Sequence, residues 1–360
     1  MIDPWLPRTT LAGHDLAPGG IGALQDAAIG VPCARVAAGS SRMAWPDVAR
    51  GYGIVLVVIG HSIGGMLAGG QVQERDTLGG LFFLMYTFHM PLFFILSGMF
   101  MPDRLGRPLG DLARSSAVRI VYPYFVWGLV QIAVIAILGH LVNAPIRPSV
   151  LLFLQVLWEP PSQFWFLYCL VLYQAAAVLF GRYAGLTAML AAALAARLAC
   201  EAVELPKIVD LFARYWIFYA GAIRFADCLR DDRVVRSGSQ WLFGLAAAWL
   251  AAAVVSAWGG GYGSLWNLPA ALLGSLLVMG LAHRPDPLRG ALAELGRCSM
   301  PIFVTHVLIV AGVRIGLTKI LGVSDPLVIL PVATAAGLLI PYGAYRWLDR
   351  RGLAGLAALK

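Results

Sequence analysis

One run of sequence decides the fold: residues 45–62, WPDVARGYGIVLVVIGHS. It is apolar enough to begin a membrane span, yet it carries Arg50 near its start and His61 eleven residues further on. In a helix that separation is about 16 Å, or half the thickness of a bilayer. Ionisable groups at membrane depth are costly, so each of them needs a reason to be there. The run therefore predicts a membrane helix that links a cation at the membrane edge to an imidazole near the midplane.

The composition is that of a helical membrane protein that crosses the bilayer several times. Of the 360 residues, 59% are hydrophobic and only 13% are charged, whereas soluble domains are about half apolar and a quarter charged. The apolar runs are continuous and do not alternate, which argues against a β-barrel. The net charge of +8 is explained by basic residues in cytoplasmic loops, so nucleic acid is not an expected partner. The cysteines are scattered, and neither disulfides nor a metal site are expected.

Hydropathy predicts an all-α, polytopic transmembrane helix bundle with about ten spans. Residues 1–42 are rich in Ala, Gly and Pro and are expected to form a disordered tail, with Met43 as an alternative start. Residues 43–350 would form the membrane domain, and residues 351–360 a cytoplasmic C-terminal tail. The predicted spans are residues 48–68, 79–100, 117–140, 162–180, 183–200, 211–228, 240–258, 264–282, 299–318 and 327–347.

The basic residues predict the orientation of these spans. With both termini in the cytoplasm, the inner segments hold 20 of the 27 Lys and Arg residues and the outer segments hold five. This excess on one side is typical of the cytoplasmic side of a membrane protein. The remaining two, Arg214 and Arg314, fall near the outer ends of spans, and their side chains are expected to extend to the outer surface.

Three histidines fall inside predicted spans: His61, His89 and His306. Counting 1.5 Å per residue places His61 and His89 at similar depth on consecutive spans, with His306 closer to the cytoplasm. The alternative for each is a residue whose hydrogen bonds simply join two helices. That alternative weighs least for His61, because Arg50 and the adjacent Ser62 make its surroundings more specific. No carboxylate accompanies these histidines at metal-ligand spacing.

Two further patterns belong to the same region of the chain. Residues 88–98, FHMPLFFILSG, contain Pro91, which frees the backbone carbonyl of residue 87 and predicts a broken helix beside a cavity. Asp47 and Arg50 are three residues apart on one helix and are expected to pair. Four arginines on the cytoplasmic side suit the phosphates of a cofactor, with topology alone as the alternative. They are Arg104, Arg107, Arg114 and Arg119.

These motifs resemble the acyltransferase 3 family of integral-membrane acyltransferases, and the first two resemble its fucose 4-O-acetylase-like branch. The resemblance covers about residues 43–350. Each motif alone is weak, but the five motifs in this order are specific. The resemblance implies about ten helices, acetyl-CoA as the usual acyl donor and a carbohydrate acceptor. It maps Arg50 and His61 onto the family's paired functional positions and His89 onto its second motif. The motifs are DVARG at 47–51, GHS at 60–62, FHMPLFFILSG at 88–98, FWFL at 164–167 and GRCSMPIFVTH at 296–306.

The sequence therefore predicts an O-acetyltransferase of the bacterial inner membrane that modifies a surface or exported polysaccharide. His61 would act as general base, with His89 orienting it or stabilising the oxyanion. Arg50 and the arginines of residues 104–119 would hold the phosphates of acetyl-CoA. A transient acyl-histidine is an alternative route. The competing interpretation is a transporter or flippase for a glycan or a small solute, because midplane polar residues and a broken helix also suit transport.

Overall fold

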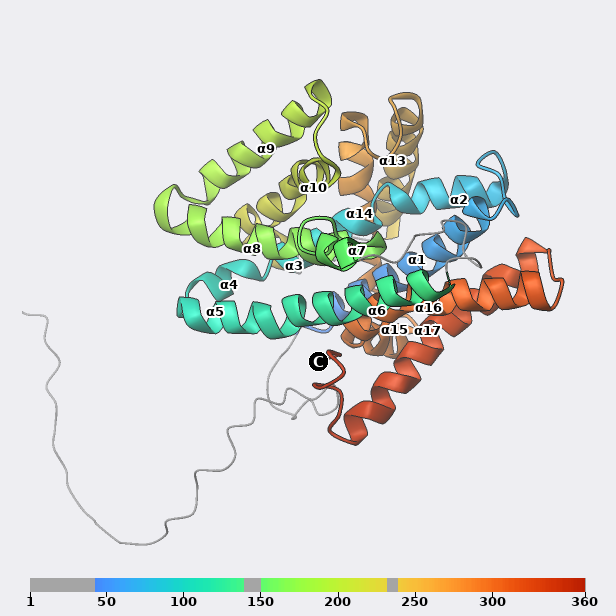
Figure 1. The fold of residues 1–360 in the computed structure, drawn as a ribbon. Coiled ribbons are helices and arrows are strands. Elements are labelled where there is room, and N and C mark those ends of the chain that lie inside the picture. The colour runs from blue at the N-terminus through green and yellow to red at the C-terminus, as the bar shows by residue number, and fades with distance from the viewer. Residues whose placement is uncertain (1–42, 139–149, 232–238, 360) are drawn as a thin grey trace, which may run out of the picture. The chain divides into compact units, whose positions relative to one another are not determined.

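The computed structural model describes residues 43–138, 150–231 and 239–359, and in these ranges it contains helices and no strand. The predicted tail, residues 1–42, lies outside the described residues. The elements in chain order (Figure 1) are α1 (Trp45–Ala68), α2 (Thr77–Tyr86), α3 (His89–Gly98), α4 (Met101–Leu105), α5 (Leu109–Ser116), the π-helix η1 (Ala117–Val121), α6 (Tyr122–Leu138), α7 (Val150–Gln155), η2 (Ser162–Phe164), α8 (Trp165–Tyr183), α9 (Leu186–Ala202), α10 (Lys207–Arg224), α11 (Ala226–Arg230), α13 (Ser239–Trp258), η3 (Leu265–Asn267), α14 (Leu268–Ala282), α15 (Arg289–Arg297), α16 (Ser299–Ile315), the π-helix η4 (Gly316–Ile320) and α17 (Pro326–Arg350).

The predicted all-α bundle is confirmed. Within the described residues, eight helical segments are long and apolar enough to cross a membrane, and each coincides with a predicted span. The two other predicted spans correspond to α9 and α10, which pack against each other. Helix α9 has only 17 residues, and α10 carries Lys207, Asp210, Arg214 and Arg224. The total of ten spans and the cytoplasmic termini stay predictions. Following them, we call the Arg50 end of α1 the inner end and the Ala68 end the outer end.

Helix α1 is the central element of the bundle. It begins with Pro46 in its first turn, where proline costs no hydrogen bond. It packs against α2, α3, α14, α15, α16 and α17. The closest approach is to α15, where two glycines replace side chains with backbone contact. A Cβ added to Gly51 would lie 2.0 Å from the Leu292 carbonyl oxygen, and one added to Gly296 would lie 1.8 Å from that of Asp47.

The break predicted at Pro91 separates α2 from α3 at Thr87 and Phe88. Because proline has no N–H, the carbonyl of Thr87 lacks its usual helical partner. The Asn267 side chain supplies the missing hydrogen bond, since its Nδ2 donates to the Thr87 carbonyl at 2.9 Å. Asn267 is itself held by the Ser256 hydroxyl, which donates to its Oδ1 at 3.0 Å. The broken helix is thus stabilised by a buried polar contact from Ser256 on α13 and Asn267 in η3.

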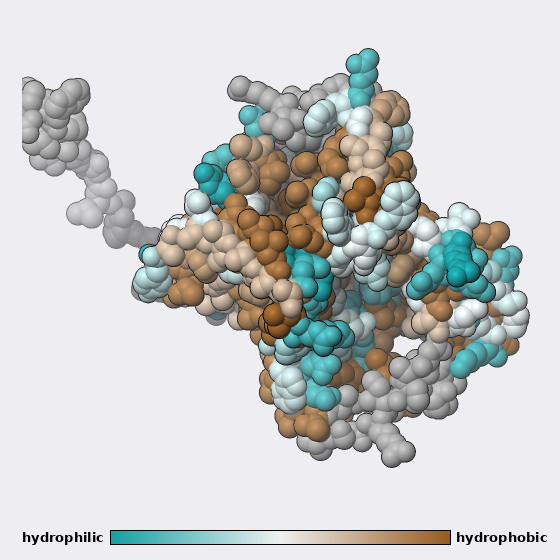
Figure 2. Space-filling model, turned by 90° about the horizontal axis from the view of Figure 1, so that it is seen from above, coloured by the Kyte–Doolittle hydropathy of each residue, from teal (hydrophilic) through white to brown (hydrophobic). Residues whose placement is uncertain are grey.

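The outer surface of the helices is strongly apolar. Figure 2 shows apolar side chains covering much of one face, with hydrophilic residues gathered in separate groups. Large side chains such as Phe243 and Trp258 on α13 are exposed, as expected for helices that contact lipid. The last residues behave differently from a free tail, because the Trp127 indole on α6 donates to the Ala357 carbonyl at 3.1 Å. The Tyr122 hydroxyl likewise donates to the Leu356 carbonyl at 3.0 Å.

Candidate active site

Arg50 and His61 lie on one face of an unbroken helix. Helix α1 runs without interruption from Trp45 to Ala68. Eleven residues make three turns and about 20°, so the two side chains leave the helix in nearly the same direction, about 16 Å apart along the axis. The predicted spacing therefore puts a guanidinium at the inner end and an imidazole deeper in the bundle.

The imidazole of His61 packs against that of His306 on α16. Their ring centroids are 5.0 Å apart, at an interplanar angle of 62°. His61 is half-buried, whereas His306 is fully buried. The Nδ1 of His306 lies 2.8 Å from the Phe303 carbonyl oxygen and 3.0 Å from that of Ile302. Carbonyls only accept hydrogen bonds, so Nδ1 carries the proton and Nε2 is left as an acceptor. This Nε2 has no hydrogen-bond partner.

His89 lies close to this pair but contacts it through a tyrosine. Its Nδ1 donates to the Met85 carbonyl at 2.8 Å, which leaves its Nε2 as an acceptor too. The Tyr86 ring meets the His89 ring edge to face, with centroids 4.6 Å apart. The same tyrosine also packs on α1 at Gly60, the residue before His61. A Cβ added to Gly60 would lie 3.1 Å from Tyr86 Cε2. Tyr86 therefore connects His89 to the helix that carries His61.

At the inner end, Arg50 shares an aromatic ring with a second arginine. The predicted pair is confirmed, since Arg50 Nη1 donates to Asp47 Oδ1 at 3.1 Å. The Arg50 guanidinium carbon lies 5.8 Å from the centroid of Phe100, and that of Arg230 lies 5.3 Å from the same centroid. Arg230 is fixed there, because it donates to both oxygens of Asp103 at 2.9 and 3.0 Å. Its Nε also donates to the Met99 carbonyl at 2.7 Å.

Among the four predicted loop arginines, Arg104 is influenced by two of the others. Burial lowers the pKa of the Arg104 guanidinium, and the positive charges of Arg119 and Arg107 lower it further. Arg104 Nη2 also donates to the Ser115 hydroxyl at 3.4 Å. Arg114 is exposed on α5. A half-buried cation surrounded by like charges is favourable where an anion balances it.

A family model described as an acyltransferase domain, acyltransferase 3, matches residues 43–346. The chain belongs to the acyltransferase 3 family. This membership favours acyl transfer over the transporter interpretation, and with the apolar helices it makes the protein a multi-pass membrane acyltransferase. The fucose 4-O-acetylase-like branch stays a prediction. Neither the curated proteins nor the solved structures gave a match.

The sequence assigns no role to two residues that lie beside the predicted site residues, Arg230 and His306. Arg230 follows Arg50 by 180 residues and looks like any other cytoplasmic charge, so no local pattern marks it. His306 was counted as closer to the cytoplasm than His61, because depth was measured from span edges alone. The structure instead brings the rings of His306 and His61 into contact. Its position at the end of the 296–306 motif was the one available signal.

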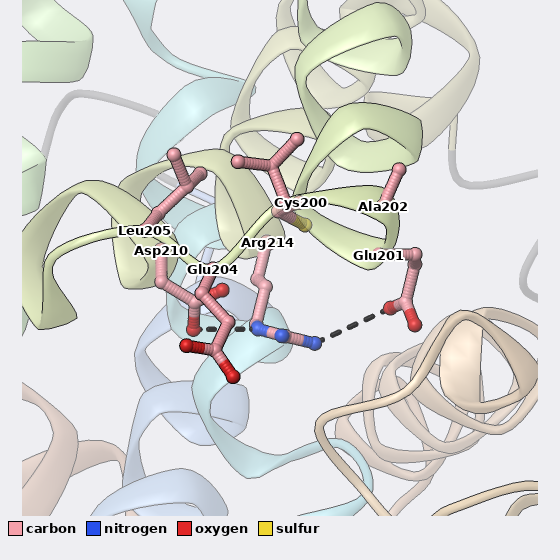
Figure 3. A pocket seen from close by; sticks show the side chains of 8 residues that line it. Cys200, Glu201, Ala202, Glu204, Leu205, Asp210 and Arg214 are labelled. Atoms are coloured by element: carbon pink, nitrogen blue, oxygen red, sulfur yellow. Dashed lines mark hydrogen bonds and ion pairs between the residues drawn. The ribbon is translucent and has the colours of Figure 1, made fainter.

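The acyltransferase also has a pocket at the turn between α9 and α10, shown in Figure 3. Its volume is about 390 Å³, and its lining includes the acidic residues Glu201, Glu204 and Asp210. Arg214 crosses it, with Nε donating to Asp210 Oδ2 at 2.6 Å and Nη1 to Glu201 Oε1 at 3.3 Å. None of the predicted site residues lines this pocket. Arg214 is therefore held by two carboxylates within the protein.

Proposed function

We propose that this acyltransferase moves an acetyl group from cytoplasmic acetyl-CoA to a sugar hydroxyl of a surface or exported polysaccharide, in a bacterial inner membrane. One observation carries the proposal: Arg50 and His61 share one face of α1, and the His306 ring packs on that of His61. This arrangement offers a phosphate-binding group and a proton acceptor about 16 Å apart. CoA has the matching design, because a long pantetheine arm separates its phosphates from the thioester.

The inner arginines suit the CoA phosphates. Guanidinium groups bind phosphate oxygens with two parallel hydrogen bonds. The guanidinium groups of Arg50 and Arg230 both lie over the Phe100 ring. The positive charges of Arg107 and Arg119 act on the half-buried Arg104. The phosphates would neutralise this cluster, and that electrostatic gain would favour binding from the inner side. Arg114 would add only a peripheral charge.

In the reaction, neutral His61 takes the proton of the sugar hydroxyl. The sugar oxygen forms a bond to the thioester carbonyl carbon, and the carbon–sulfur bond then breaks. The imidazolium of His61 returns the proton to the departing sulfur, so the products are CoA thiol and acetyl ester. His306 acts as a positioning residue, because its ring packs against that of the base. His89 would hold Tyr86 beside the site. The alternative in which His61 carries the acetyl group outward uses the same residues.

The test is His61→Gln, measured for CoA release from acetyl-CoA and for CoA affinity on the same purified protein. Glutamine can form hydrogen bonds but cannot take a proton at neutral pH, so we expect activity to fall by about 10²-fold or more. CoA affinity should be unchanged, because the phosphates bind about 16 Å away. His283→Gln is the matched control, since the His283 ring stacks on Trp45 and not on His61.

Three results would contradict the proposal. Retained activity in His61→Gln would remove the general base. Lost CoA affinity in a folded variant would place the donor elsewhere. A wild-type protein that neither binds CoA nor releases it from acetyl-CoA would exclude this donor. Mass spectrometry of cell glycans with and without the protein would then identify the acceptor by the loss of acetyl groups.

A further inference from the structure

Arg314 on α16 is buried in the membrane region without an acidic partner among the described residues. Its side chain is 8% exposed, so it does not extend to the outer surface as the sequence suggested. Its Nε is buried with no hydrogen-bond partner, and its guanidinium pairs with no described carboxylate. An unpaired charge inside a membrane protein is costly, and such residues are retained mainly for a ligand or a transport path.

Arg314 lies beside the outer end of α1, beyond His61. A Cβ added to Gly65 would lie 3.2 Å from Arg314 Nε, and one added to Gly69 would lie 2.8 Å from Nη1. Gly65 follows His61 by four residues, which is about 6 Å along the helix. Along α1 the order is therefore Arg50, His61 and Arg314, from the inner end to the outer end. Arg314 lies on the far side of the base from the proposed CoA phosphates.

A second polar group without a partner occupies the same place. The Oε1 atom of Gln71 is buried and accepts no hydrogen bond, and it would lie 2.5 Å from the same added Cβ on Gly69. The backbone of Gln71 is fixed, because its N–H donates to the Met66 carbonyl at 2.9 Å. The next residue, Val72, is buried in an apolar cluster with Met66. The cationic donor Arg314 and the neutral acceptor Gln71 thus both lie beside Gly69, in an ordered part of the bundle.

We propose that Arg314 and Gln71 bind an anionic oxygen group, a carboxylate or a phosphate, on the sugar acceptor. The guanidinium donates to the anion, and Gln71 Oε1 accepts a hydrogen bond from a neighbouring hydroxyl. The inference rests on the proposed function, because it assigns the outer side of His61 to the acceptor. Arg214 shows the contrast: it is also near an outer helix end, but Asp210 and Glu201 already neutralise it.

The experiment measures binding to the full chain purified in dodecyl maltoside, a detergent without charge. The probes are trigalacturonic acid for carboxylates, glucose 1-phosphate for phosphate, maltotriose as the neutral sugar, and dioleoyl phosphatidylglycerol for a lipid headgroup. We expect at least one anionic sugar to bind about tenfold more tightly than maltotriose, the range of one charge-assisted hydrogen bond. Arg314→Gln should abolish this preference, and Arg314→Lys should keep part of it.

Two matched variants make the test specific. Arg214→Gln removes an outer arginine that is already paired, so the preference should survive. Gly69→Ala keeps all charges but adds a methyl group in the space beside Arg314 and Gln71. It should therefore weaken the preference for anionic sugars. CoA affinity is measured in parallel. Arg314→Gln should leave it unchanged, and Arg50→Gln should weaken it without changing the preference for anionic sugars. A wild-type protein that binds no CoA but keeps the preference for anionic sugars would therefore contradict the proposed donor alone.

Several outcomes would overturn the inference. If wild-type protein binds all sugars equally, there is no anion subsite, whether or not the variants fold. If only phosphatidylglycerol binds in an Arg314-dependent manner, the group is a lipid headgroup and the acceptor assignment is wrong. If Arg314→Gln is folded and keeps the preference, another residue carries the charge.

Discussion

The glycine contacts between α1 and α15 allow a quantitative prediction. Gly51 and Gly296 let each helix touch the backbone of the other, near Leu292 and Asp47 respectively. Asp47 pairs with Arg50 at the inner end, and α15 leads into α16, which carries His306. We consider Gly51→Ala, which adds one methyl group at this contact. Because backbone cannot rotate away as a side chain does, the two helices must separate.

The size of the effect follows from the distances. The new Cβ would lie 2.0 Å from the Leu292 carbonyl oxygen, and such contacts are not found below 3.0 Å. The helices must therefore shift by about 1 Å or more. Overpacking of this kind costs about 1–3 kcal/mol, partly offset by the better helix propensity of alanine, worth about 1 kcal/mol. A displacement of 1 Å at a catalytic group costs about 10²-fold in rate.

The assays are the melting temperature, the CoA affinity and the rate of CoA release from acetyl-CoA. We expect Gly51→Ala to lower the melting temperature, to weaken CoA binding through Arg50, and to reduce turnover by about 10²-fold. Gly290→Ala, also on α15, is the matched control, because an added Cβ there meets no atom within 4 Å. It should be neutral or slightly stabilising. If Gly51→Ala keeps wild-type turnover and melting temperature, the backbone contact does not position the site.

Three other predictions follow from the contacts described above. Arg50→Lys and Arg230→Lys keep the charge but lose the two-pronged guanidinium, so each should weaken CoA binding, as measured by calorimetry; unchanged affinity would make both arginines purely topological. Asn267→Leu leaves the Thr87 carbonyl buried without its donor, so the melting temperature should fall with a cost of about 1–3 kcal/mol, and an unchanged value would contradict that role. A topology reporter after Lys360 should give a cytoplasmic signal and one at Gly260 a periplasmic signal; reversed signals would refute the orientation.

Features within one helix were accessible from the sequence. The rise and twist of an α-helix convert the spacing of Arg50 and His61 directly into a distance and a direction. The same geometry predicted the Asp47–Arg50 pair, which the structure confirms. The chemistry of Pro91 predicted a broken helix, although not the residue that satisfies the freed carbonyl.

Contacts between helices were not accessible in this way. The pairing of His61 with His306 depends on how α1 and α16 pack against each other, and the residue spacing within either helix does not specify that packing. The depths of His61 and His306, counted from the edges of their predicted spans, contain no information about how the two helices pack. Arg314 was expected at the surface because long basic side chains commonly reach the interface, and hydropathy does not show which helices enclose it. Arg230 required knowledge of where α11 meets α4.

The contacts made by the last residues have a consequence for biosynthesis. The Trp127 and Tyr122 donors on α6 leave the ribosome 230 and 234 residues before their acceptors, Ala357 and Leu356. At typical translation rates that delay is roughly 10 to 50 seconds. During this interval the indole and phenol are available to other partners, such as lipid headgroups or the insertion machinery. The two hydrogen bonds therefore form only after Leu356 and Ala357 have been synthesised, and a chain that stops before them leaves these two α6 side chains without those acceptors.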